Sequence, residues 1–545
     1  MAHNWALADV HEVVAAAIPE RTMIVWGDRR CTFGEVAQRS RALARYLRGA
    51  GFGDCRDRAD LERWECGQDR GAVLSHNRPE HVEAILAAWK ARVVPCNVNY
   101  HYTAREIADL LRRIGVRAVV YERGLGHKLA DVAADLDLLI EVDDGSTAPS
   151  LSGAVDHEHA IALGGGDRAL PAPSPDDLHI ACTGGTTGHP KAVLWRQADL
   201  FVAGMGGADG RGEDALRERA VRGAGTWFPT SPLMHVAAQW TTFLAAGMGA
   251  TVVLHDDAQP FAVRTILETA ARERVNMMTI VGDAYARPMI DELRRTEYDL
   301  SSLATIGTGG APTSAEAKRA LMELLPRVSI RDGYGASEIG AMTSGVASAN
   351  GPEVQHFPLG PTARLLSADR TRFLDPGTDA DADEVGWMAK CDRVPLGYLD
   401  DQAATEATFP VIAGVRVAIP GDRARFTPDG QVELLGRDSL VVNTGGEKVF
   451  VEEVEDVLKR HADVVDALVI GRPSERFGQE VTAIVQLTSQ AEPHPVALRE
   501  WCAASLARYK APRAFVFVDR VQRHASGKAD YTWARATSLQ AVEVR

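Results

Sequence analysis

The stretch CTGGTTGHPK at residues 182–191 decides which kind of fold this chain can form. The apolar runs LHIA (178–181) and AVLW (192–195) flank it, so we predict a glycine-rich loop between two strands. Glycines let backbone N–H groups converge on an anion, and threonines and a lysine add donors and charge. The stretch indicates a phosphate site, with a plain glycine-rich hairpin as the alternative. It differs from the pattern GxxxxGK[ST], because Pro190 separates His189 from Lys191. The predicted phosphate contacts are Thr183, Gly184, Gly185, Thr186, Thr187, Gly188 and Lys191.

Upstream of this loop, helical and strand patterns alternate. Apolar spacing predicts helices over residues 33–51 and 79–91. Short apolar runs predict strands over 71–77, 93–99 and 116–122. Strands that alternate with helices favour an α/β fold with a layered, largely parallel sheet.

Downstream, the pattern changes near residue 436. Residues 436–461 predict a turn, a strand, a glycine turn and an amphipathic helix, and two further strands follow. We therefore expect a large domain over residues 1–436 and a compact α+β domain over 437–545. The charged segment 54–69 and the glycine-rich segment 204–212 are expected to be surface insertions.

Composition narrows the class of protein. The 545 residues carry a formal net charge of -14, which argues against nucleic acid as a partner. Seven cysteines without a CxxC pair favour free thiols in a reducing cytoplasm. The N-terminal residues lack the pattern of a signal peptide, and no apolar run is long enough to span a bilayer. A peripheral membrane contact and a homodimer stay open.

With its context, the loop resembles the phosphate-binding signature [ST]SGTTGxPK of the adenylate-forming superfamily, which includes acyl-CoA synthetases and the adenylation domains of peptide synthetases. Gly184 stands where Ser or Thr is common. Six further stretches follow in that family's order: PLMHVAA (232–238), GTGGAPTS (307–314), DGYGASE (332–338), GD (421–422), NTGGEKVF (443–450) and HASGKADY (524–531). The resemblance covers essentially the whole chain. It implies a large multi-layered N-terminal domain with mixed and parallel sheets, and a small mobile α+β C-terminal domain.

The resemblance also implies site residues. Lys191, His235 and Lys528 would be catalytic, with His235 beside the acyl carboxylate and Lys528 reaching the carboxylate and the α-phosphate. Glu338 and Thr183 would hold Mg2+, for which carboxylate and hydroxyl oxygens are suitable ligands. The implied nucleotide-binding set adds Gly310, Ala311, Pro312, Asp332, Gly333, Tyr334, Gly335, Ala336, Ser337, Asp422 and Arg437. In that set, Tyr334 would stack on adenine and Asp422 would bind the ribose hydroxyls.

Two positions depart from the family pattern. Pro420 stands where a threonine usually precedes the Gly-Asp pair. The usual hinge acid two residues after Arg437 is replaced by Ser439, with Asp438 just before it, so the hinge residue stays open between these two. Gly445 and Gly446 would enter the site when the small domain rotates.

The implied activity is a two-step ligase reaction that uses ATP, Mg2+ and coenzyme A. A carboxylate attacks the α-phosphorus of ATP, pyrophosphate leaves, and the acyl-adenylate then forms a CoA thioester with release of AMP. The stretch HVAAQWTTF after the histidine contains no acidic residue, which disfavours an amino-acid substrate. The chain resembles bacterial acyl-CoA synthetases of the FadD type, which implies a fatty acid or a steroid side-chain acid as substrate. Residues 236–248 and 277–288 would line the acyl pocket, unless they are only a buried helix and strand.

Three alternatives remain at this stage. An acyl-AMP ligase would pass its product to a carrier protein instead of coenzyme A. A stand-alone adenylation domain would serve a synthetase. A non-catalytic nucleotide-binding protein would keep the fold without turnover, but intact polar residues at the motif positions argue against it.

Overall fold

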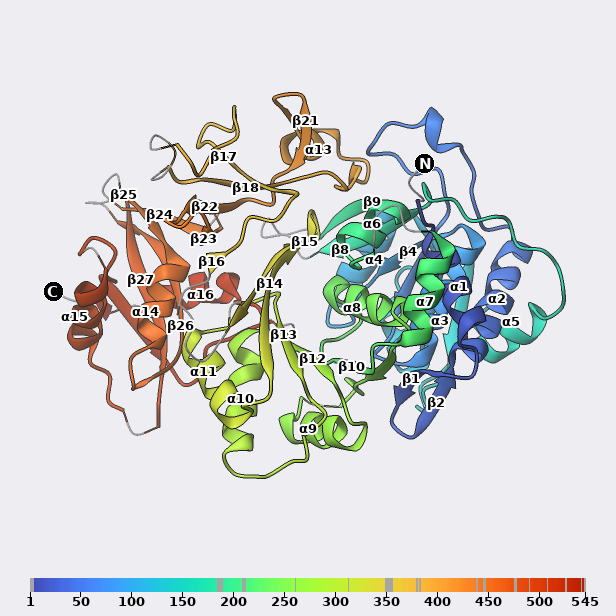
Figure 1. The fold of residues 1–545 in the computed structure, drawn as a ribbon, viewed down its shortest axis with the longest axis horizontal. Coiled ribbons are helices and arrows are strands. Elements are labelled where there is room, and N and C mark those ends of the chain that lie inside the picture. Colours follow the sequence, from blue (N-terminus) through green and yellow to red (C-terminus); the bar gives the residue numbers. More distant parts are fainter. Residues whose placement is uncertain are drawn as a thin grey trace.

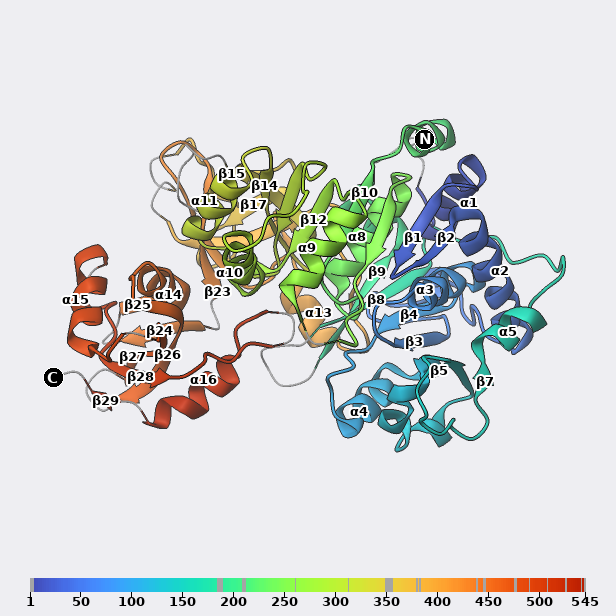
Figure 2. The same ribbon diagram turned by 90° about the horizontal axis from the view of Figure 1, so that it is seen from below.

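The computed structural model describes residues 4–183, 190–207, 212–259, 261–311, 313–347, 356–378, 381, 384–437, 440–444, 447–474, 478–489, 491–506, 508–524, 527–540 and 542–543. Within them, two eight-stranded sheets and a smaller sheet precede a C-terminal α/β unit. That unit lies at the far end of the molecule from the N-terminus (Figures 1 and 2). The expected fold class, an α/β protein with large mixed and parallel sheets and a small C-terminal α+β part, is therefore confirmed.

The first large sheet has the strand order β15-β14-β13-β12-β10-β11-β1-β2. Its inner strands are parallel, and β2 and β15 add antiparallel edges. The strands are β1 (Thr22–Trp26), β2 (Arg29–Thr32), β10 (Thr226–Pro229), β11 (Thr251–Leu254), β12 (Met277–Ile280), β13 (Thr305–Thr308), β14 (Ser329–Ala336) and β15 (Gly340–Ala347).

The second large sheet has the order β19-β9-β8-β4-β3-β5-β6-β7. The predicted strands 71–77, 93–99 and 116–122 are confirmed at its centre, although the first two are shorter and end at Leu74 and Asn97. The strands are β3 (Arg70–Leu74), β4 (Val94–Asn97), β5 (Val116–Glu122), β6 (Leu138–Val142), β7 (Val155–Asp156), β8 (Leu178–Thr183), β9 (Lys191–Arg196) and β19 (Gly397–Tyr398).

The predicted helices 33–51 and 79–91 are confirmed as α2 (Phe33–Gly49) and α3 (Pro79–Ala91). A capping box of Thr32 and Glu35 starts α2, which satisfies two backbone N–H groups. Every residue of α3 is buried, and Trp89 lies in the main hydrophobic core with Phe33. Helix α3 therefore lies in the interior, and α2 contributes its buried face, with Phe33, to the same core.

The other helices cover the sheets. In the N-terminal part they are α1 (Leu7–Ala17), α4 (Ala104–Ile114), α5 (His157–Leu163), α6 (Gln197–Ala203), α7 (Glu213–Arg222), α8 (Val236–Gly247), α9 (Val263–Arg272), α10 (Gly282–Leu293), α11 (Ala315–Leu324) and α13 (Gln402–Thr408). No helix in the described part of the chain is both long and apolar enough to cross a bilayer.

A smaller sheet connects the large sheets to the C-terminal unit. It is ordered β16-β23-β22-β18-β21-β20, and β17 also pairs with β18. Its strands are β16 (His356–Phe357), β17 (Ala363–Leu366), β18 (Gly386–Cys391), β20 (Val411–Ile412), β21 (Val415–Ala418), β22 (Asp422–Phe426) and β23 (Val432–Arg437).

The C-terminal unit has its own hydrophobic core. The predicted strand and helix after residue 436 are confirmed by β24 (Val441–Thr444) and α14 (Val451–Lys459), with β25 (Glu447–Phe450) between them, whereas Gly445 and Gly446 of the predicted glycine turn lie outside the described residues. The remaining elements are β26 (Val464–Ser474), β27 (Gly478–Leu487), α15 (Pro495–Ser505), β28 (Ala514–Val518), α16 (Tyr531–Thr537) and β29 (Val542–Glu543).

The two expected insertions differ in how much of them is described. Segment 54–69 is largely exposed and is closed by a bridge between Asp54 and Gln68. It also contacts the body of the protein, because the carbonyl of Trp64 accepts a hydrogen bond from the N–H of Asp400 at 2.8 Å. Gly204 caps α6, whereas residues 208–211 of the glycine-rich segment lie outside the described residues.

Candidate functional site

The phosphate-loop motif lies on an antiparallel hairpin, as its flanking strands predicted. Thr183, the last residue of β8, is directly opposite Lys191, the first residue of β9. The fold therefore brings the two ends of the motif to adjacent positions. The predicted contacts Gly184, Gly185, Thr186, Thr187 and Gly188 lie outside the described residues, as does the side chain of Thr183.

Lys191 and Glu338 meet at a third side chain, Tyr398. The ammonium of Lys191 lies 4.5 Å from the centroid of the Tyr398 ring, within the range of a cation–π interaction. The Tyr398 hydroxyl donates to Oε1 of Glu338 at 3.0 Å. Tyr398 was not among the predicted site residues, because only the pairing of β19 with β9 places it there.

His235 stands at the N-cap of α8 with its imidazole buried. Burial, aided by the positive charge of Lys528, lowers its pKa from 6.5 to about 4, so the ring is neutral at neutral pH. Within the described residues, its Nε2 atom is buried and has no hydrogen-bond partner. Buried polar atoms are nearly always paired, so this nitrogen is suited to a ligand oxygen.

Lys528 is far from His235 in sequence, but its charge acts on that histidine. The turn before it packs against the N-terminal end of α10: Gly527 has φ 77°, and a Cβ there would lie 3.2 Å from Cβ of Ala284. Arg523 pairs with Asp466 at 2.7 Å on one side of this turn. A glycine is therefore needed at 527 for both its backbone conformation and its close approach to α10.

The predicted ribose and adenine side is built from three strands. The Tyr334 hydroxyl on β14 donates to Oδ2 of Asp422 on β22 at 2.6 Å. Asp422 lies opposite Arg437 in the β22–β23 ladder, although the Arg437 side chain is not among those described. The fold thus gathers Tyr334, Asp422 and the backbone of Arg437.

The glycine positions of the adenine motif follow from close backbone packing. Gly310 has φ 76°, which favours glycine, and it is followed by Ala311. A Cβ on Gly335 would lie 2.5 Å from the carbonyl of Gly340, so no side chain fits there. Ser337, after Ala336, accepts from the Trp195 indole at 2.8 Å through its carbonyl.

The side chain of Asp332 is bound by other side chains of the protein. It accepts from the Thr308 hydroxyl at 2.8 Å and forms an ion pair with Lys318. Its neighbour Gly333 lies opposite Ser344 in the β14–β15 ladder. Asp332 therefore has a clear role in holding β14, whatever it adds to nucleotide binding. Five other predicted positions lie outside the described residues: Pro312, Asp438, Ser439, Gly445 and Gly446.

The two predicted acyl-pocket segments form α8 and the β12–α10 unit. Along β12, Met278 and Ile280 are buried, whereas Met277 and Thr279 on the other face are half-buried. This alternation leaves one face of the strand accessible beside the turn that contacts Gly527. Lining of an acyl pocket stays a prediction.

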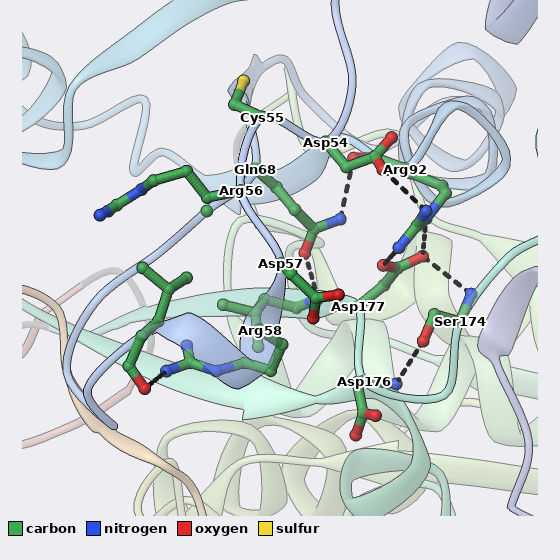
Figure 3. A pocket seen from close by; sticks show the side chains of 13 residues that line it. Asp54, Cys55, Arg56, Asp57, Arg58, Gln68, Arg92, Ser174, Asp176 and Asp177 are labelled. Atoms are coloured by element: carbon green, nitrogen blue, oxygen red, sulfur yellow. Dashed lines mark hydrogen bonds and ion pairs between the residues drawn. The ribbon is translucent and has the colours of Figure 1, made fainter.

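One cavity lies elsewhere, between segment 54–69 and residues 174–178, with a volume of about 350 Å³. In Figure 3, Arg92 lies between the carboxylates of Asp54 and Asp177. Arg92 binds Asp177 at 2.9 Å and Asp54 at 2.8 Å, and Arg58 donates to the carbonyl of Leu61 at 2.7 Å. These groups satisfy each other, so we assign the cavity no ligand.

Comparison with known proteins agrees with this arrangement. The model of the family described as AMP-binding enzyme matches residues 11–387, and that of the AMP-binding enzyme C-terminal domain matches residues 453–528. The medium-chain acyl-CoA ligase Mig of Mycobacterium avium is 42% identical over 97% of this chain and 98% of that protein. The 3-oxocholest-4-en-26-oate–CoA ligase of Rhodococcus rhodochrous is 35% identical over 97% and 95%.

Solved structures agree in fold. The anthranilate CoA ligase AuaEII, determined in complex with anthranoyl-AMP, superposes with a TM-score of 0.80 at 20% sequence identity. The superposition covers 98% of this chain and 97% of that one.

Proposed function

The chain belongs to the AMP-binding enzymes, in the family of adenylate-forming acyl-CoA synthetases, and on that premise we propose that it ligates a medium-chain or long-chain fatty acid, or a steroid side-chain acid, to coenzyme A. The observation that carries the proposal is that the turn before Lys528 packs against the N-terminal end of α10, from where the charge of Lys528 acts on His235. A buried, neutral imidazole with an unpaired nitrogen in the described part of the chain lies within the field of a lysine from the other unit.

This pair is suited to a carboxylate substrate. A carboxylate is ionised near neutral pH, so adenylation needs no general base. The neutral His235 would donate a hydrogen bond to one carboxylate oxygen from its otherwise unpaired side. Lys528 would neutralise charge on the carboxylate and on the α-phosphate as the new P–O bond forms and pyrophosphate leaves.

Lys191, Tyr398 and Glu338 would hold the phosphate side. The Tyr398 ring supports the ammonium of Lys191, and its hydroxyl occupies one oxygen of Glu338. The second carboxylate oxygen is then left for Mg2+, which takes one or two protein carboxylates and fills its shell with phosphate oxygens and water. Magnesium would neutralise phosphate charge. Thr183 at the end of β8 is the proposed hydroxyl ligand.

Tyr334, Asp422 and Arg437 would bind the nucleoside. Tyr334 is fixed by its hydrogen bond to Asp422, which would orient its ring for stacking on adenine. Asp422 would accept from the ribose hydroxyls. We also propose that residues 437–545 move as a unit, withdrawing Lys528 and bringing Gly445 and Gly446 to the site for thioester formation.

The relatives support the proposed acid class. One is named as a medium-chain ligase and another as a ligase of a 3-oxocholestenoate, and both align with almost the entire chain. All seven cysteines are free thiols, which supports a reducing compartment such as the cytoplasm.

The test is direct. Purified protein is incubated with Mg-ATP and acids from acetate to long-chain and steroid acids, with and without coenzyme A, and AMP, pyrophosphate and acyl products are followed by mass spectrometry. Acyl-CoA and AMP that form only with coenzyme A are expected. Acyl-adenylate that accumulates equally with coenzyme A present would instead indicate transfer to a carrier protein. No turnover and no ATP binding would refute the proposal.

A further inference from the structure

We propose that Asn97 is a positioning residue that links the phosphate loop to the loop carrying His235. Asn97 is the last residue of β4, and its side chain is buried. Its Oδ1 accepts from the N–H of Cys182 at 2.9 Å. Its Nδ2 donates to the carbonyl of Cys182 at 3.1 Å and to that of Met234 at 2.6 Å.

These three bonds join two separate chain segments. Cys182 directly precedes Thr183, which lies opposite Lys191, and Met234 directly precedes His235. Asn97 thus forms hydrogen bonds with the residue directly before Thr183 and with the residue directly before His235.

The Asn97 side chain extends the pairing of β4 with β8. The backbones of the two strands pair at Cys96 and Ile180, two residues before Cys182. At Cys182, the Asn97 side chain supplies the acceptor and the donor that a neighbouring strand would supply. The same amide still has a second N–H for Met234, which a backbone group would lack.

Only an amide satisfies this set of partners. An aspartate at 97 would accept from Cys182, but it would face two carbonyl oxygens without a proton to donate. An alanine would leave one N–H and two C=O groups in need of partners. The opposite side of the histidine loop is anchored separately, because Oδ1 of Asn77 accepts from the N–H of Leu233 at 2.6 Å.

The functional consequence is a fixed spacing between the carboxylate end and the phosphate end of the site. Attack on the α-phosphorus requires both reactants at a defined separation, and a displacement of about 1 Å can cost about 100-fold in rate. Because this role rests on the proposed function, the test first requires acid-dependent ATP–pyrophosphate exchange by the wild type. Failure of that reaction would count against the function, not against Asn97.

The experiment compares Asn97→Asp, Asn97→Ala and a control, Asn99→Ala, in pyrophosphate exchange with the best acid of the panel above. Asn99 is two residues away, and its Oδ1 accepts a local bond from the N–H of His101. We expect a fall in the maximal exchange rate of about 100-fold for both Asn97 variants. ATP binding, measured by calorimetry, should change much less, and Asn99→Ala should resemble the wild type.

A double-mutant cycle separates positioning from general damage to the fold. Asn97→Asp is combined with His235→Ala and, separately, with Lys191→Ala. We expect each double variant to lie within about threefold of the slower single variant, because residues that act as a unit are not additive. Rate losses that multiply in either cycle would overturn the link. So would Asn97→Asp and Asn97→Ala with wild-type exchange rates, or unfolding of Asn97→Asp accompanied by an equal loss of ATP binding.

Discussion

Replacing Glu455 with glutamine should stabilise the C-terminal unit at pH 8 and leave it unchanged at pH 4.5. Glu455 lies on α14, fully buried, and its Oε1 accepts from the N–H of Val469 at 2.8 Å and from the Tyr531 hydroxyl at 3.0 Å. A glutamine amide oxygen can accept the same two bonds. The substitution therefore removes a titratable proton while keeping the shape and the partners.

The magnitude follows from the pKa. Burial raises the pKa of Glu455 from 4.5 to about 7, despite the opposing charge of Lys459. Below pH 4.5 the carboxyl is protonated in both the folded and the unfolded state, so it has no pH-dependent effect. Between pH 4.5 and 7 stability is lost as pH rises, and the full loss is about 3 kcal/mol above pH 7. Glu455→Gln has no titratable carboxyl at this position, so it does not lose this stability as pH rises.

The assay is hydrogen–deuterium exchange of β26 in the full-length chain, which reports opening of this unit without requiring two-state unfolding of the whole protein. Wild type and Glu455→Gln are compared at equal pH, so intrinsic exchange rates cancel. Glu500→Gln, at an exposed position of α15, serves as the control and should differ from the wild type by less than about 0.5 kcal/mol. Equal protection of wild type and Glu455→Gln at pH 8 would refute the reasoning.

Three further predictions concern the site. Lys528→Ala should slow acid-dependent pyrophosphate exchange by at least about 100-fold, because the charge of Lys528 is proposed to act in adenylation. Thioester formation from supplied acyl-adenylate should be spared, and an equal loss in both assays would contradict the proposed role. Tyr398→Phe keeps the ring beside Lys191 but removes the hydrogen bond to Glu338. The Mg2+ concentration for half-maximal ATP binding should therefore rise about tenfold. An unchanged Mg2+ titration would count against Tyr398 as the partner of the proposed metal ligand Glu338. As pH falls from 7 to 4.5, the free energy of unfolding of His235→Gln should rise by about 2.5 kcal/mol relative to that of the wild type. The reason is that a histidine whose folded pKa is lowered to about 4 destabilises the folded state as pH falls below 6.5. Denaturant midpoints of variant and wild type that shift in parallel between the two pH values would exclude this.

Local sequence patterns predicted the elements well where one interaction dominates. The uninterrupted apolar run at 116–122 became β5, and the run at 79–91, with Pro79 at its first turn, became the buried helix α3. Strand ends were less predictable: residues 75–77 look like a continuation of β3, but their backbone turns away to meet other segments. His76 there bonds Glu122, and Asn77 bonds Asp257.

The order of the motifs and the residue types in them were determined by the sequence alone, because glycine turns, a threonine-rich loop and a charged lysine carry their chemistry in short stretches. The tertiary structure decided which of these residues meet. The contact of the Lys528 turn with α10, the place of Tyr398 between Lys191 and Glu338, and the bonds of Asn97 to Cys182 and Met234 all join segments distant in the chain. Such contacts depend on strand order and register, which arise from burying whole sheet faces and not from any local pattern.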